Sequence, residues 1–157
     1  MPLLHVIKTI SVIMECEYDY KNRSKKNRSS NTDEVLVVIQ WHSKERNYMY
    51  RWYNPNSCGK KVGDCVIGAI TKGLDKDWYR VYIELCIYGL KSCDMPSSNA
   101  VWHKYLTDNG YFQKLTNLTV KEFCEKHPYG KYILATGSHV IAVEDGDYYD
   151  AWDSGEE

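Results

Sequence analysis

The pattern of hydrophobic and polar positions divides the chain into a β-rich beginning, a helical middle and a β-rich end. Residues 3–20 are rich in β-branched side chains, which favours a strand. Residues 34–42 (EVLVVIQWH) predict a stronger strand, which forms a hairpin with residues 49–53. Residues 21–34 are polar, basic and rich in Ser and Asn, so we expect a mobile loop there rather than a nucleic-acid patch.

Between residues 65 and 128 the apolar positions recur with helical spacing. The run VIGAI (66–70) places its apolar side chains on one face of a helix that begins at Cys65 and ends at Gly73. Thr119 and Glu122 have the spacing of a capping box at the start of a later helix. Three further helices are therefore expected, at 75–90, 97–110 and 119–128.

The period changes to that of strands in the last segment. Residues 131–136, 139–144 and 147–153 predict three strands, and Asp145-Gly146 is a strong signal for a two-residue hairpin turn. Helices followed by a run of antiparallel strands predict an α+β domain.

Composition narrows the class of protein. The 157 residues, 43% of them hydrophobic and 26% charged, fit one globular domain with a core of its own. A net charge of −1 gives no support for a nucleic-acid or membrane partner. Residues 1–15 are apolar but interrupted by Lys8 and carry no cleavage site, so we expect neither a secretory leader nor a membrane span. A monomer in the cytoplasm is the expectation.

Six cysteines allow three interpretations. A disulfide framework is conceivable, but the chain is long enough to bury a core without one, so we expect free thiols in a reducing compartment. The shared spacing of Cys58 with Cys65 and of Cys86 with Cys93 would suit a four-cysteine zinc site. Structural zinc sites usually have two to four residues between paired ligands, which makes zinc the weaker alternative. We expect no metal and no other cofactor.

Cys65 is the first candidate for chemistry. Asp64 is a natural N-cap, which would place Cys65 at the first helical residue. The unpaired N–H groups and the dipole of a helix start favour a thiolate, the reactive form of cysteine. The alternative is that Cys65 is a small core residue that happens to follow an N-cap aspartate.

His139 and Asp153 are the other two candidates. With Asp145-Gly146 as the turn, His139 lies opposite Trp152, and Asp153 is the next residue of the partner strand. A carboxylate there would orient the imidazole, and an imidazole facing Cys65 would accept the thiol proton. The alternatives are a strand-end histidine without a partner and an aspartate that belongs to a turn.

The order of these residues resembles that of the papain-like cysteine peptidases. The resemblance rests on NPNSCGKKVGDCVIGAI (54–70) and GSHVIAVEDGDYYDAWDSG (137–155), and it is closest to small papain-fold proteins of bacteriophages and bacteria. It extends over roughly residues 52–157, including CDMPSSNAVW (93–102). Residues 1–50 would then be an N-terminal extension or edge hairpin, and residues 51–157 a papain-like catalytic domain.

The resemblance implies a papain-like fold and a thiol peptidase or related acyl-transfer activity. Carried over to this chain, Cys65 is the nucleophile, His139 the general base and Asp153 the orienting acid. A protein or peptide is the implied substrate, cleaved at a peptide or isopeptide bond without a cofactor. For a phage protein the compartment would be the host cytoplasm.

One position departs from the papain-like pattern. A Gln six residues before the nucleophile usually completes the oxyanion hole, and Gly59 stands there instead. Asn56 is our preferred replacement, with Asn54 and Lys60 as alternatives and the backbone N–H of Cys65 as second donor. Because of this departure, a catalytically silent binding protein remains an alternative function. An amidase or a transglutaminase-like acyl transferase also remains open, because all share the nucleophile geometry.

Overall fold

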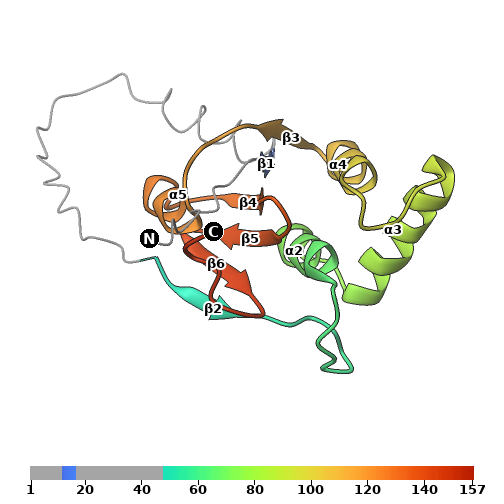
Figure 1. The fold of residues 1–157 in the computed structure, drawn as a ribbon, viewed down its shortest axis with the longest axis horizontal. Coiled ribbons are helices and arrows are strands. Elements are labelled where there is room, and N and C mark those ends of the chain that lie inside the picture. Colours follow the sequence, from blue (N-terminus) through green and yellow to red (C-terminus); the bar gives the residue numbers. More distant parts are fainter. Residues whose placement is uncertain (1–11, 17–47) are drawn as a thin grey trace, which may run out of the picture.

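The computed structural model describes residues 12–16 and 48–157, which form an α+β fold around one six-stranded mixed sheet (Figure 1). Its strands are β1 (Val12–Cys16), β2 (Tyr50–Trp52), β3 (Tyr111–Lys114), β4 (Lys131–Ala135), β5 (Val140–Glu144) and β6 (Asp147–Asp150). Their order across the sheet is β2-β6-β5-β4-β1-β3. Only the pairing of β2 with β6 is parallel among these strands. The predicted α+β class is confirmed.

Helices cover both faces of the sheet (Figure 1). They are α2 (Cys65–Leu74), α3 (Trp78–Ser92), α4 (Asn99–Asp108) and α5 (Val120–Lys126). In β5, Val140 and Ala142 pack in the core with α2, α3 and α4, while Ile141 and Val143 pack with α5. This alternation explains why the strand is apolar at consecutive positions, since both of its faces are buried.

Helix α2 packs closely on the sheet. Val66, Ala69 and Ile70 are buried at the spacing of one helical face. A Cβ added to Gly73 would lie 2.9 Å from Cδ1 of Ile133, so glycine is required there for close approach to β4. The prediction that Gly73 ends the helix is wrong by one residue. Helix α2 continues to Leu74, and Asp75 is the C-cap in the left-handed conformation.

The other helices begin directly after capping residues, and α3 starts at Trp78 rather than at the predicted residue 75. Asp77 and Ser98 cap α3 and α4 through their side chains, and Thr119 forms the expected capping box with Glu122. The first turn of α5 receives two further bonds, because Val120 and Lys121 donate their backbone N–H groups to carbonyls of Glu157 and Gly155. The C-terminal residues are thereby fixed beside α5.

Among the described strands, β1 and β3 depart most from expectation. β1 lies within the predicted strand 3–20, but it pairs with both β3 and β4 and so sits inside the sheet. Residues 12–16 therefore belong to the same domain as the rest, not to an extension or an edge hairpin. β3 was not predicted at all. The predicted loop 21–34 and strand 34–42 lie outside the described residues.

No helix in the described part of the chain is long and apolar enough to cross a membrane.

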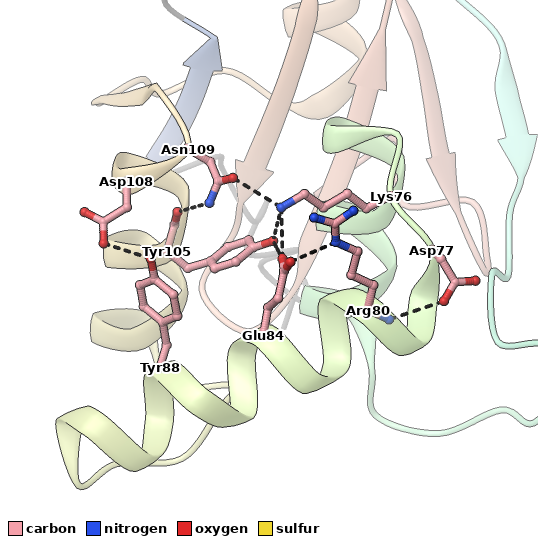
Figure 2. Close-up of polar contacts among 8 residues, drawn as sticks. All are labelled: Lys76, Asp77, Arg80, Glu84, Tyr88, Tyr105, Asp108 and Asn109. Carbon is pink, nitrogen blue, oxygen red and sulfur yellow. Dashed lines mark hydrogen bonds and ion pairs between the residues drawn. The ribbon is translucent and has the colours of Figure 1, made fainter.

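A polar network joins α3 and α4 to the end of α2 (Figure 2). Lys76 donates to Glu84, Tyr105 and Asn109 at 2.9, 2.9 and 3.2 Å. Glu84 also accepts from Arg80 at 2.9 Å and from Tyr105. Burial alone would raise the pKa of Glu84, but these hydrogen bonds and the Lys76 charge lower it to about 2.

We predict that Glu84→Gln lowers the free energy of unfolding near pH 7 by about 1–2 kcal/mol, the value of a partly screened charged hydrogen bond. Since the folded pKa of Glu84 lies below its ordinary 4.5, this stability is present above pH 4.5 and is lost as pH falls towards about 2. Urea unfolding at several pH values measures it. Glu125→Gln, at an exposed position of α5, is the control. A difference that is as large at pH 2 as near neutrality would contradict the assignment to the Glu84 charge.

Candidate active site

A cleft of about 510 Å³ opens at the start of α2. The loop before α2, the first turn of α2 and the adjoining ends of β5 and β6 line it. Cys65, His139 and Asp150 are among the lining residues, with Tyr53, Tyr149 and Trp152 as aromatic walls. The structure thus brings together residues that are more than 70 positions apart along the chain.

Cys65 is the first residue of α2 and is half-buried. Burial by itself raises the pKa of its thiol. The hydrogen bond with His139, the charge of that ring and the backbone N–H groups of Val140 and Val66 together outweigh burial, so the pKa lies below its ordinary value. The predicted thiolate environment is present, and the nearby histidine contributes more to it than the helix start does.

His139 directly precedes β5, and its side chain is only 5% exposed. Its Nε2 lies 2.6 Å from Oδ2 of Asp150, which leaves Nδ1 as the ring nitrogen for Cys65. Burial lowers the pKa of His139, but the bonds to Asp150 and Cys65 and their charges raise it to about 9. The imidazole is therefore protonated at neutral pH, and its charge favours the thiolate form of Cys65 over the thiol.

Trp152 covers the imidazole from the solvent side. Its ring stacks on His139 with centroids 4.1 Å apart and an interplanar angle of 26°, and half of its surface remains exposed. It is therefore not a core residue. The stack shields the bond between His139 and Asp150 from water.

Asp150 is the carboxylate of the site, and sequence reasoning missed it. It is the last residue of β6 and is 7% exposed. Its Oδ1 accepts the N–H of Ala151 at 2.7 Å, which fixes the carboxylate while Oδ2 faces the imidazole. Its carbonyl accepts the N–H of Tyr53 at 2.8 Å, so the chain leaving β2 also holds this residue in place.

The prediction of Asp153 as the orienting acid is corrected by this geometry. Asp153 accepts the hydroxyl of Tyr148 and, at 3.1 Å, the N–H of Gly155. These bonds lower its pKa and close the turn after β6. Its role in the structure is to shape the C-terminal turn, and the imidazole has Asp150 as its partner instead.

The register of the hairpin contains the signal that was overlooked. Ala142 pairs with Tyr149 and Glu144 with Asp147, so continuing the count places Asp150 opposite Ile141. Ile141 and His139 are two residues apart and share one phase of the strand alternation. Asp150 has that same phase and Asp153 has the opposite one. Counting the alternation as well as the distance from the turn would have selected Asp150.

The preferred oxyanion donor is also corrected. Asn56 is buried outside the lining of the cleft, where its Oδ1 accepts the N–H of Cys58 and its carbonyl accepts that of Gly59. It therefore shapes a turn. Of the alternatives, Asn54 and Lys60 do line the cleft, and the Nδ2 of Asn54 reaches only the Lys60 carbonyl, at 3.4 Å.

The remaining cysteines are separate thiols. Those at 58, 65, 86, 93 and 124 are free. Among residues 12–16 and 48–157, no group of three or more His, Cys, Asp or Glu residues is placed to hold a metal ion. The two equally spaced pairs therefore do not converge on a zinc site. Burial raises the pKa of Cys124 to about 12, which makes it an inert internal reference for Cys65.

Comparison of the chain with protein-family models, curated proteins and solved structures found no match. The assignment of the site therefore rests on its own geometry.

We predict that Asp150→Asn lowers the pKa of His139 from about 9 by roughly one to three pH units, because it removes the opposite charge beside the ring. Asp153→Asn is the matched control and leaves that pKa unchanged. A titration of the histidine ring signals by NMR measures both. The reverse result, with Asp153→Asn giving the larger change, would restore the original assignment.

Proposed function

We propose that this protein is a papain-like cysteine hydrolase that cleaves a peptide or isopeptide bond with Cys65, His139 and Asp150. The observation that carries the proposal is the buried chain of contacts from Asp150 through His139 to Cys65 in an open cleft. A nucleophile, a base and a group that orients the base form the recurring unit of acyl-transfer catalysis. The place of Cys65 at a helix start and of His139 directly before a strand supports the proposal, while Asp150 replaces the Asp153 that the resemblance implies.

In the first half of the proposed reaction, the Cys65 thiolate attacks the carbonyl carbon of the substrate. The carbonyl oxygen takes up the electron pair as a new C–S bond forms. The backbone N–H of Cys65 is the proposed first donor to that oxygen, and the Asn54 amide is the cleft-lining candidate for a second donor. His139 then gives its proton to the leaving nitrogen, the C–N bond breaks, and the amine departs.

In the second half, water hydrolyses the thioester. His139, now neutral, takes a proton from the water as its oxygen attacks the acyl carbon. The C–S bond breaks, the acid product leaves, and the thiolate beside a protonated His139 returns. Asp150 holds the ring orientation throughout and stabilises its cationic form, while Trp152 keeps water from their bond.

One observation favours a second candidate, a catalytically silent binding protein with the same fold. Gly59 supplies no side chain where papain-like enzymes have a Gln, and Asn56 lies off the cleft. Loss of one oxyanion donor costs about 10²–10³ in rate, so the completeness of this hole separates an efficient enzyme from a binding module. An amidase or a transglutaminase-like transferase would share the thiolate and differ in its acceptor or product.

We predict that iodoacetamide labels Cys65 faster than Cys58 or Cys124 near pH 7. In His139→Ala the same labelling slows by about tenfold or more, because burial remains and the lowering of the Cys65 pKa by His139 is lost. Mass spectrometry of digested protein gives the rate at each site. Cys58 is the internal control, since it is exposed and lies in the same loop region.

Equal labelling of Cys65 and Cys58, or a Cys65 rate that does not depend on His139, would overturn the hydrolase proposal. Fast, His139-dependent labelling without cleavage of any peptide in a diverse library would favour the silent binding protein.

The charges of the cleft predict its substrate preference. Its carboxylates at Asp64, Asp150 and Glu157 are each hydrogen-bonded within the protein. Lys60 and Lys61 also line the cleft, on an exposed loop, and neither has an ion pair among the described residues. Lys60 and Lys61 are therefore the cations open to a substrate on the loop side of the cleft, and they favour acidic substrate side chains there.

We predict that cleaved peptides are enriched in Asp and Glu near the scissile bond. Lys60→Met with Lys61→Met lowers kcat/KM for an acidic peptide by about fivefold, the value of one exposed ion pair, and leaves its Gln counterpart unchanged. Lys126→Met, on α5, is the matched control. An equal loss for both peptides would show that the lysines act on the loop and not on the substrate charge.

A further inference from the structure

Asp64 stands at the N-cap of α2 and yet does not cap it. Its backbone has φ −112° and ψ 26°, and its side chain makes no capping hydrogen bond. The carboxylate instead accepts the indole N–H of Trp78, with Oδ2 2.9 Å from Nε1. By contrast, Asp77 and Ser98 accept first-turn N–H groups of the helices that they precede. The exception falls on the helix that carries the candidate nucleophile.

The position matters because the first-turn N–H groups of α2 are needed elsewhere. The Val66 N–H stabilises the Cys65 thiolate, and the Cys65 N–H is the proposed donor to the substrate oxygen. An Asp at an N-cap usually accepts from the second or third residue of its helix, which here are Val66 and Ile67. A carboxylate bound there would compete for the same donor and would place a negative charge beside the thiolate.

Trp78 is well fixed for this task. It is the first residue of α3, whose start Asp77 caps through the N–H groups of Tyr79 and Arg80. The indole stacks on Tyr82 with centroids 5.1 Å apart, and Tyr79 meets it edge-on at 5.3 Å. Tyr79 in turn accepts a 2.7 Å hydrogen bond from Ser57, in the loop before α2. The aromatic cluster Trp78, Tyr79 and Tyr82 thus ties the start of α3 to the loop that delivers Cys65.

We propose that Trp78 is a positioning residue that holds the Asp64 carboxylate away from the first turn of α2 and leaves its N–H groups free for the Cys65 sulfur and the substrate oxygen. This inference rests on the proposed function, since it assigns Trp78 a part in preparing the same nucleophile. Trp78 is not among the residues that line the cleft, so it acts through Asp64 alone.

The charged groups around Cys65 make this contribution measurable. His139 bonds the sulfur directly, and Asp150 acts on it through that ring. Lys60, Lys61 and Glu157 line the same cleft, and Asp64 is the neighbour whose carboxylate Trp78 controls. Substitution of Trp78 changes none of these groups except the placement of Asp64.

The test is the pH dependence of iodoacetamide labelling at Cys65 in the full chain. Trp78→Phe keeps an aromatic ring for Tyr82 but removes the N–H donor. The released carboxylate then binds the helix start, and the midpoint of labelling rises by at least about 0.5 pH unit. Adding Asp64→Asn to Trp78→Phe removes that charge and brings the midpoint back towards the parent value. Trp52→Phe, at an exposed indole of β2, is the control.

Asp64→Asn in the parent is a second, milder variant, which keeps an oxygen for Trp78. We expect it to leave the midpoint unchanged, because the carboxylate is already held away from the sulfur. A midpoint that falls in this variant, or one that Trp78→Phe does not move, would overturn the role of Trp78. A raised midpoint that Asp64→Asn does not reverse would equally reject it in favour of general loosening. These outcomes differ from failure of the proposed function, in which parent Cys65 itself shows no fast, His139-dependent labelling.

Discussion

The hydrogen bond between His139 and Asp150 is the interaction on which the candidate site depends. Both side chains are more than nine-tenths buried, so each would be costly to ionise without the other. Their 2.6 Å contact compensates for that burial and fixes the ring so that its second nitrogen faces Cys65. The Cys65 thiol responds with a lowered pKa despite its own burial. Without the carboxylate, burial would favour the neutral forms of both the imidazole and the thiol.

The scaffold brings the two halves of this arrangement together by packing α2 on β4 and β5. Gly73 lets the helix approach Ile133, and Ala69 and Ile70 complete the contact within the larger core cluster. Polar links also hold the helix: Lys72 pairs with Glu144 of β5, and Lys76, just after α2, donates to Glu84 of α3 and Tyr105 of α4 (Figure 2). A rigid seat of this kind places the first residue of α2 opposite the start of β5.

The fold also gives each carboxylate of the last hairpin a specific partner. Glu144 pairs with Lys72 and Lys131, Asp147 with Arg51, and Asp150 with His139. In the sequence they form one acidic run, but each has a different partner and a different task. Asp153, only three residues after Asp150, instead binds Tyr148 and Gly155 and shapes the turn that follows. Extending the hairpin register beyond its last paired residues was thus a poor guide to which acid His139 would meet.

The sequence by itself determined the α+β class, the starts of α4 and α5, and the hairpin at Asp145-Gly146, because capping residues, turn residues and hydrophobic period act over a few positions. It also selected Cys65 and His139, whose chemistry is legible in their local settings. Tertiary structure alone decided the rest. Strand β1 lies between β4 and β3, and local sequence could not predict this because its pairing partners lie about a hundred residues away. Trp78 from α3 took Asp64 away from its expected cap. The identity of Asp150 as the partner of His139 was only partly predictable. Strand alternation in the sequence is consistent with Asp150, but only the structure showed that the paired strand β6 ends at this residue.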